Sequence, residues 1–162
     1  MIEEITLIRK LTKRGENLIQ LAEEATELGE VCLKIIDSNV DTFNITNADF
    51  YEELADVRLC IDLIDDYVID TFEVHAPNKD ILKHIVKLCF RLSKAAIKCR
   101  RATTEGASPT PVTAEEAEQN LFKAIVSLKS FIDVLGYDYW NSATVDHIYK
   151  EKAVRYLGRV LD

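Results

Sequence analysis

Four acidic side chains recur as two pairs with helical spacing. Glu24 and Glu27 are three residues apart in "AEEATELGEV", and Glu53 and Asp56 are three apart in "YEELADV". Residues at positions i and i+3 share one face of an α-helix, so each pair directs two carboxylates to the same side. Two antiparallel neighbouring helices would bring both pairs together. The spacing therefore predicts a site of converging carboxylates.

Carboxylates held this close together need a compensating cation. A like-charge pair about 4 Å apart costs on the order of 4 kcal/mol at an effective dielectric constant near 20. Both pairs lie among apolar residues, with Ala25 and Leu28 beside the first and Leu54 and Ala55 beside the second. An all-oxygen ligand set suits Mg²⁺ or Mn²⁺ better than Zn²⁺. The alternative is a set of solvated glutamates on exposed helix faces, some favoured by the helix dipole.

The motifs that carry these acids resemble those of a known family. The run Glu23-Glu24-Ala25-Thr26-Glu27 looks like E-E-x-x-E, and Glu53-Leu54-Ala55-Asp56 looks like the E-x-x-D that follows it. Together they resemble the MazG-like, all-α nucleoside triphosphate pyrophosphohydrolases. That family includes dimeric dUTPases, dCTP pyrophosphatases and phosphoribosyl-ATP pyrophosphohydrolases. The closing segment "IYKEKAVRYLGRVL" is similar to the basic last helix of some members.

The resemblance implies Mg²⁺-dependent hydrolysis of a nucleoside triphosphate to the monophosphate and pyrophosphate. By position, Glu24, Glu27, Glu53 and Asp56 would be the metal ligands, and Glu23 would orient or deprotonate the attacking water. The expected substrate is a deoxynucleotide such as dUTP or dCTP, or a non-standard nucleotide. Phosphoribosyl-ATP is an alternative substrate for the same chemistry.

Basic side chains would contact the phosphates of such a substrate. The candidates are Lys152, Arg155 and Arg159 near the C-terminus, with Lys34, Lys87 and Arg91 elsewhere. A solvated basic face is an equal alternative for the C-terminal group, because cations also suit a helix C-terminus. Aromatic candidates for a wall against the base are Phe50, Tyr137, Tyr139 and Trp140, although aromatic side chains lie more often in the core.

Apolar residues spaced by three and four predict an all-α bundle of about five helices. The expected helices span residues 3–36, 48–72, 79–102, 113–136 and 143–161. Gly15 favours a kink or a break in the first helix. Asn47 or Asp49 is the expected N-cap of the second helix. Thr113, followed three residues later by Glu116, predicts a capping box at the start of the fourth.

The second and fourth predicted helices align without a gap, and so do the first and third. "FYEELADVRLCIDLI" aligns with "LFKAIVSLKSFIDVL", and "EATELGEVCLK" with "LCFRLSKAAIK". In this register Glu24 and Glu27 align with Leu88 and Arg91. Glu53 and Asp56 align with Ala124 and Ser127. We therefore expect a single all-α domain over residues 1–162, duplicated in tandem as a pseudo-dimer. Residues 1–76 would be the metal-binding half and 79–162 an acid-depleted half with a basic C-terminal helix. Periodicity alone could also align two amphipathic helices.

Composition limits the classes of partner. The chain has 162 residues and a net charge of −8, which argues against a nucleic-acid partner because phosphate backbones attract basic surfaces. The N-terminus lacks the apolar core of a signal peptide, and no segment is long and apolar enough to predict a membrane span. Four cysteines without a C-x-x-C pair indicate reduced thiols in a cytoplasmic protein. The duplication leaves open whether the chain also forms a homodimer.

Two other functions compete with the enzymatic one. A helical interaction or regulatory module could keep a vestigial acidic site without activity. A carboxylate-bridged di-iron bundle usually needs an E-x-x-H motif, and the sequence has none. The sequence therefore favours the pyrophosphohydrolase, with the interaction module as the alternative from another class.

Overall fold

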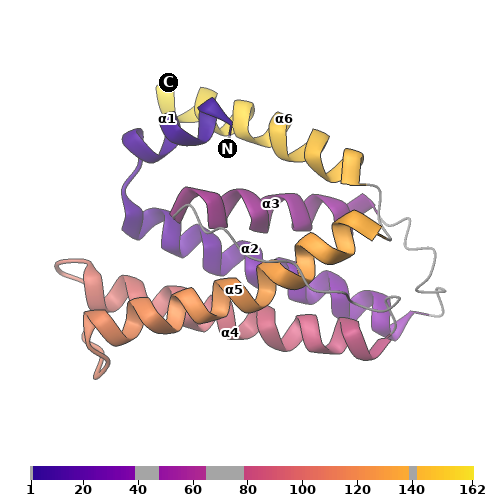
Figure 1. Ribbon diagram of the computed structural model, residues 1–162. Coiled ribbons are helices and arrows are strands. Elements are labelled where there is room, and N and C mark those ends of the chain that lie inside the picture. The colour runs from indigo at the N-terminus through magenta and orange to yellow at the C-terminus, as the bar shows by residue number, and fades with distance from the viewer. Residues whose placement is uncertain (1, 39–47, 65–78, 139–141) are drawn as a thin grey trace.

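The computed structural model describes residues 2–38, 48–64, 79–138 and 142–162 (Figure 1). These residues form six helices and no strand. The helices are α1 (Glu3–Leu11), α2 (Arg14–Asp37), α3 (Ala48–Ile64), α4 (Lys79–Thr103), α5 (Ala114–Asp138) and α6 (Ser142–Leu161). The predicted all-α helical bundle is confirmed. The second predicted helix can be followed only to Ile64, because its expected end and the N-cap candidate Asn47 lie outside the described residues.

The expected first helix is divided in two, which gives six helices where about five were predicted. The break lies at Thr12 and Lys13, two residues before Gly15, and both have extended backbone angles. The Thr12 hydroxyl donates to the Ile8 carbonyl and accepts from the Asn17 amide, both at 2.9 Å. Gly15 instead meets the residue that follows α4: a Cβ there would lie 2.8 Å from the Thr104 hydroxyl.

The helices stack in layers (Figure 1). The long helices α2 and α4 pack along each other, α2 also packs against α3, and α4 packs against α5. The helices α1 and α6 contact each other and cover α3 on the side away from α4 (Figure 1). The molecule thus contains two neighbouring helix pairs, α2 with α3 and α4 with α5. The predicted tandem duplication would relate these two pairs.

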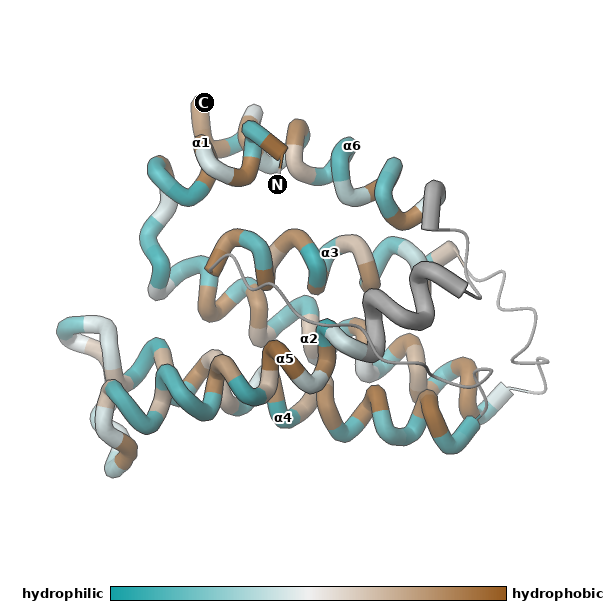
Figure 2. Tube along the Cα trace, in the orientation of Figure 1, coloured by the Kyte–Doolittle hydropathy of each residue, from teal (hydrophilic) through white to brown (hydrophobic). Residues whose placement is uncertain are grey.

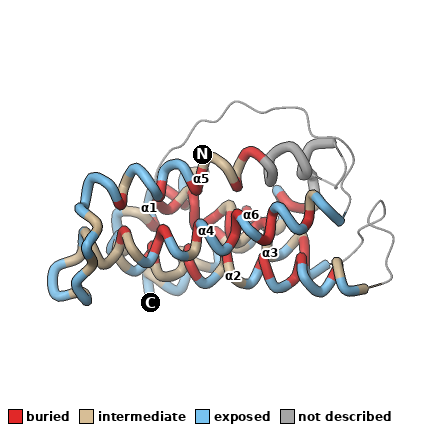
Figure 3. Tube along the Cα trace, turned by 90° about the horizontal axis from the view of Figure 1, so that it is seen from below, coloured by how far each residue is buried: buried red, intermediate tan, exposed pale blue. Residues whose placement is uncertain are grey.

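Each helix contributes buried side chains to one core (Figure 3). Apolar and polar residues alternate along the chain trace, as expected for amphipathic helices (Figure 2). The helix α3 departs from this pattern because nine of its seventeen residues are buried hydrophobics. Packing against α1, α2 and α6 accounts for this burial, because it leaves α3 little surface for solvent. The central helix is therefore the one that carries Glu53 and Asp56.

Two local features predicted from the sequence are present in the structure. The predicted capping box is present, because the Glu116 amide donates to the Thr113 hydroxyl and the Thr113 amide donates to the Glu116 carboxylate, each at 3.2 Å. Four cysteines are buried and free, as the sequence predicted: Cys32, Cys60, Cys89 and Cys99. Among the described helices, none combines the length and the apolar character that crossing a membrane requires.

Candidate metal centre

Three of the four predicted acids converge between α2 and α3. Carboxylate oxygens of Glu24, Glu27 and Glu53 all lie within 4.8 Å of one another, and we call these residues the acid triad. Glu24 and Glu27 are one turn apart on α2, where the neighbouring Ala25 and Leu28 are fully buried. Because α2 packs against α3, Glu53 reaches the same point from the facing helix. Tertiary packing thus crowds three anions together.

Burial and the neighbouring acids make the charged state of two triad members, Glu24 and Glu53, costly. The pKa of Glu24 is raised to about 7, mainly by burial and then by Asp56, Glu27 and Glu53. The pKa of Glu53 is likewise raised to about 7, by burial and then by Glu27 and Asp56. These carboxyls would hold protons near neutral pH unless a cation replaced them.

One oxygen of the triad is left without a partner. Glu53 Oε2 is shielded from solvent and accepts no hydrogen bond from any residue in the described part of the chain. A buried carboxylate oxygen without a donor costs free energy. Three oxygens at this spacing, one of them unpartnered, fit a hard divalent cation, which takes carboxylate ligands. The donor set therefore suits Mg²⁺ or Mn²⁺.

Asp56, the fourth predicted ligand, lies beside the triad and is paired with Lys152. The Lys152 ammonium donates a hydrogen bond to Asp56 Oδ2 and lies 3.8 Å from a carboxylate oxygen of Glu52. Burial raises the pKa of Asp56, and Lys152 partly offsets that rise. Asp56 still acts on the triad electrostatically, since its charge contributes to the raised pKa of Glu24. The structure thus adds a tethered cation at the edge of the acidic site.

One member of the triad, Glu27, also lines a groove of about 390 Å³ between α2 and α4, the α2–α4 groove. Glu23 and Glu27 line this groove, so the predicted water-activating residue and one triad member share a surface. Opposite them lie Ser93 and Ile97 of α4. The hydroxyls of Ser93 and Thr26 are 3.1 Å apart, within hydrogen-bond distance. Sequence reasoning missed the α4 contribution, because nothing local to α4 indicates which of its faces meets α2.

The basic candidates of α6 differ in their position. Lys152 is largely buried and contacts the acids, as described above. Arg155 is exposed, yet it is near enough for its charge to lower the pKa of Asp56. Arg159 is exposed further along the helix, with its guanidinium carbon 5.9 Å from the centre of the Tyr156 ring. The α6 contribution to the site is therefore centred on Lys152.

The remaining basic candidates lie on other surfaces. Lys34 is exposed in the last turn of α2, and Lys87 is exposed on α4. Arg91 lines a second groove, between α4 and α5, rather than the α2–α4 groove. Arg91 lies on a different groove because α4 packs against α2 with one face and against α5 with another.

Phe50 does not belong to the predicted aromatic wall against the base. This side chain is fully buried in the core, so it cannot face a nucleotide base. Tyr139 and Trp140 lie outside the described residues, as does the side chain of Tyr137.

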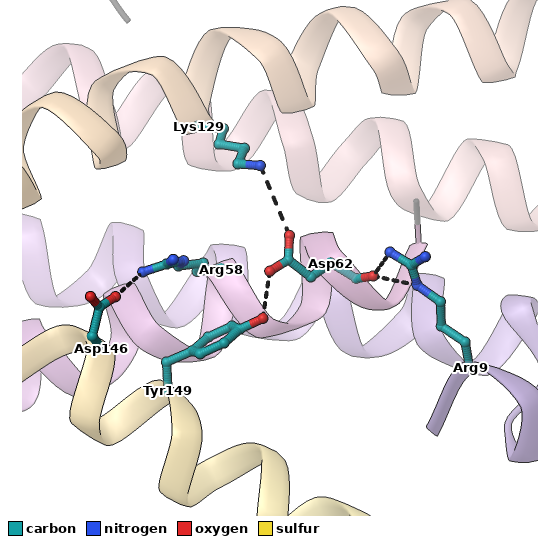
Figure 4. Close-up of polar contacts among 6 residues, drawn as sticks. All are labelled: Arg9, Arg58, Asp62, Lys129, Asp146 and Tyr149. Atoms are coloured by element: carbon teal, nitrogen blue, oxygen red, sulfur yellow. Dashed lines mark hydrogen bonds and ion pairs between the residues drawn. The ribbon is translucent and has the colours of Figure 1, made fainter. Parts of the chain in front are cut away.

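A polar cluster around Asp62 holds α3 against three other helices (Figure 4). Tyr149 donates a 2.6 Å hydrogen bond to the Asp62 carboxylate, and the Lys129 ammonium lies 3.9 Å from that carboxylate. Arg9 donates from its guanidinium to the Asp62 main-chain carbonyl. Arg58 pairs with Asp146 and lies 4.7 Å from the centre of the Tyr149 ring. These contacts fix α6, and hence Lys152, relative to α3.

Comparisons with models of known protein families, with curated proteins and with solved structures found no match to this chain. The resemblance to MazG-like enzymes therefore stays a prediction from the sequence motifs.

Proposed function

We propose that this chain hydrolyses a nucleoside triphosphate to the nucleoside monophosphate and pyrophosphate, with Mg²⁺ or Mn²⁺ held by Glu24, Glu27 and Glu53. The observation that carries the proposal is the convergence of three carboxylates within 4.8 Å, one with a buried oxygen that lacks a donor among the described residues. Glu24 and Glu53 are half-buried, which acids on a solvated face would not be, and Glu27 completes the cluster from an exposed position. A bound divalent cation would offset the negative charge of the phosphates and lower the pKa of a coordinated water.

The residues of the chain have separate tasks in this reaction. A water oxygen attacks the α-phosphorus, and the bond from that phosphorus to the bridging oxygen breaks, so that pyrophosphate leaves. Glu23, exposed at the α2–α4 groove, would accept the proton of the water. Lys152 brings a positive charge to the edge of the triad, where it would contact the phosphates. Asp56 orients Lys152 in this account and would be a further ligand to the metal ion.

The groove beside Glu27 supports a small organic substrate. Its volume of about 390 Å³ falls within the range of ligand pockets, roughly 300–1,000 Å³. Ile97 offers apolar contact, and the hydroxyls of Thr26 and Ser93 offer hydrogen bonds. A dNTP such as dUTP or dCTP, or a non-standard nucleotide, would fit this chemistry. Phosphoribosyl-ATP stays an alternative because it needs the same bond cleavage.

The test is a screen of canonical and modified nucleoside triphosphates with Mg²⁺. Released phosphate is measured with and without added inorganic pyrophosphatase, so that pyrophosphate is distinguished from orthophosphate. The variants are Glu53→Gln and Asp56→Asn. The matched control is Glu115→Gln, which removes the same charge from an exposed position in the first turn of α5.

Pyrophosphate release that requires Mg²⁺, is abolished in Glu53→Gln and persists in Glu115→Gln is the expected result. Orthophosphate as the sole product would overturn the proposed bond cleavage. Absence of hydrolysis across the screen, with binding of a protein partner unaffected by Glu53→Gln, would support the helical interaction module instead.

A further inference from the structure

A second groove, between α4 and α5, is lined by cations. It has a volume of about 280 Å³ and lies away from the acid triad, and we call it the α4–α5 groove. Four of its eight lining residues are basic: Arg91, Lys94 and Lys98 of α4 and Lys123 of α5. The other four are Ala95, Asn120, Ala124 and Ser127, so no acid lines it. This concentration of positive charge stands out in a chain with a net charge of −8.

The cations of the groove have no carboxylate partners in the described part of the chain. Within the described residues, none of the four side chains forms an ion pair or a hydrogen bond. Two arginines elsewhere in the bundle are paired with carboxylates, Arg14 with Glu118 and Arg58 with Asp146. Like charges three and four residues apart on a helix are destabilising, and Lys94 stands at those spacings from Arg91 and Lys98. A bound anion would relieve this repulsion.

Several residues of the α4–α5 groove align in sequence with acidic residues of the first helix pair. The helices α4 and α5 pack together as α2 and α3 do, and the alignment of the two pairs sets acidic residues against groove residues. The aligned positions are Glu27 with Arg91, Glu30 with Lys94, Glu52 with Lys123, Glu53 with Ala124 and Asp56 with Ser127. In this alignment cations and small residues of the groove thus replace acids of the first pair, while Glu24 corresponds to Leu88, outside the groove. Where the first pair suits a cation, the second suits an anion.

We propose that the α4–α5 groove binds a compact phosphate-bearing anion, such as pyrophosphate or the polyphosphate chain of a nucleotide, without a metal ion. Arg91 can donate two parallel hydrogen bonds to phosphate oxygens, and the lysines supply point charges around it. The Asn120 amide supplies further N–H donors at the rim. The Ser127 hydroxyl donates to the Lys123 carbonyl at 2.8 Å, so it offers the ligand no proton. The small volume favours a short anion over a longer polymer.

This inference stands on the groove and is independent of the proposed reaction. The two are separated by measuring binding in EDTA, where a divalent-cation site cannot act, and by repeating it in Glu53→Gln. The probe is inorganic pyrophosphate, titrated into the full chain by calorimetry at low ionic strength. Orthophosphate and a short single-stranded RNA are titrated in parallel.

The test variant is Lys94→Gln with Lys123→Gln, which removes one cation from each wall of the groove. The matched control is Lys83→Gln with Lys150→Gln, which makes the same change in net charge at exposed positions on α4 and α6. Circular dichroism and the thermal midpoint confirm that both variants stay folded. We expect pyrophosphate to bind in EDTA more tightly than orthophosphate, and the groove variant to lose about tenfold or more in affinity. The control and Glu53→Gln should bind pyrophosphate as the unmodified chain does.

Three results would overturn the proposal. The first is no binding of pyrophosphate in EDTA. The second is an equal loss in the control variant, which would show a general charge effect. The third is tighter binding of the RNA than of pyrophosphate, with the same dependence on Lys94 and Lys123, which would assign the groove to a polynucleotide.

Discussion

The ammonium group of Lys152, on α6, donates a hydrogen bond to the carboxylate of Asp56, on α3. Both side chains are largely buried, with 18% and 19% of their surfaces exposed. Lys152 also lowers the pKa of Glu24 and of Glu53, against the larger effect of burial. It therefore acts as a tethered cation that partly neutralises the acidic cluster, in competition with any divalent ion.

Replacing Lys152 with glutamine should separate cation binding from hydrolysis. Without the ammonium, the cluster is more negative, so Mn²⁺ should bind about tenfold more tightly. Hydrolysis should become slower, because the phosphates lose a positive contact. Mn²⁺ binding is measured by electron paramagnetic resonance, with Lys150→Gln as the exposed control on the same helix. Weaker Mn²⁺ binding in Lys152→Gln than in the control would contradict this account.

The metal-free protein should lose stability as pH rises through neutrality. Glu24 and Glu53 have folded pKa values of about 7, against an ordinary value of 4.5. Between these values the folded state binds more protons than the unfolded state, so the free energy of unfolding falls with rising pH. The urea midpoint measured in EDTA should therefore be lower at pH 8 than at pH 5. Glu53→Gln should flatten this dependence, and an unchanged slope in that variant would argue against it.

Divalent cations should restore that stability at high pH. An ion that binds only the folded state at 100 times its Kd adds about 2.7 kcal/mol to the free energy of unfolding. The thermal midpoint should therefore rise with Mg²⁺ at pH 8 and rise less at pH 5, where protons compete for the same carboxylates. Glu27→Gln should reduce the shift and Glu115→Gln should retain it. Equal shifts in these two variants would place the ion elsewhere.

The hydrogen bond from Tyr149 to Asp62 should contribute more to the free energy of unfolding than the hydrogen bond from Tyr156 to Gln20. Tyr149 donates to a carboxylate at 2.6 Å, whereas Tyr156 donates to the neutral side-chain oxygen of Gln20 at 2.8 Å. Tyr149→Phe should lower the free energy of unfolding by about 1.5–3 kcal/mol, and Tyr156→Phe by about 0.5–1.5 kcal/mol. Urea unfolding of both variants measures the difference. The reverse order would show that Asp62 is satisfied without Tyr149.

The convergence of Glu24, Glu27 and Glu53 could be anticipated because it depends on two local patterns. Helical periodicity placed the acids one turn apart, and the long α2 and α3 had to pack as neighbours. The same reasoning located the other helix ends to within a few residues, while the predicted end of the second helix at residue 72 lies outside the described residues. It placed the break of the first helix two residues late, because the side-chain bonds of Thr12 mark the end of α1.

Contacts between distant helices could not be anticipated. Lys152 and Asp56 are 96 residues apart, and their pairing depends on how α6 crosses α3. The hydrogen-bond distance between Thr26 and Ser93 likewise depends on the rotation of α4 against α2. No single-helix pattern encodes these angles. The binding of Mg²⁺ and the substrate stay predictions that the experiments above test.

The buried cysteines can report local opening of the helices that carry them. Cys32 lies on α2, Cys60 on α3, and Cys89 and Cys99 on α4, each at most 1% exposed. Burial raises the pKa of these thiols, that of Cys32 to about 12, so reactive thiolate is scarce in the closed molecule. A thiol-specific reagent can modify a given helix only when that helix separates from its neighbours. Labelling rates resolved by site would therefore rank the opening free energies of α2, α3 and α4 without any introduced probe.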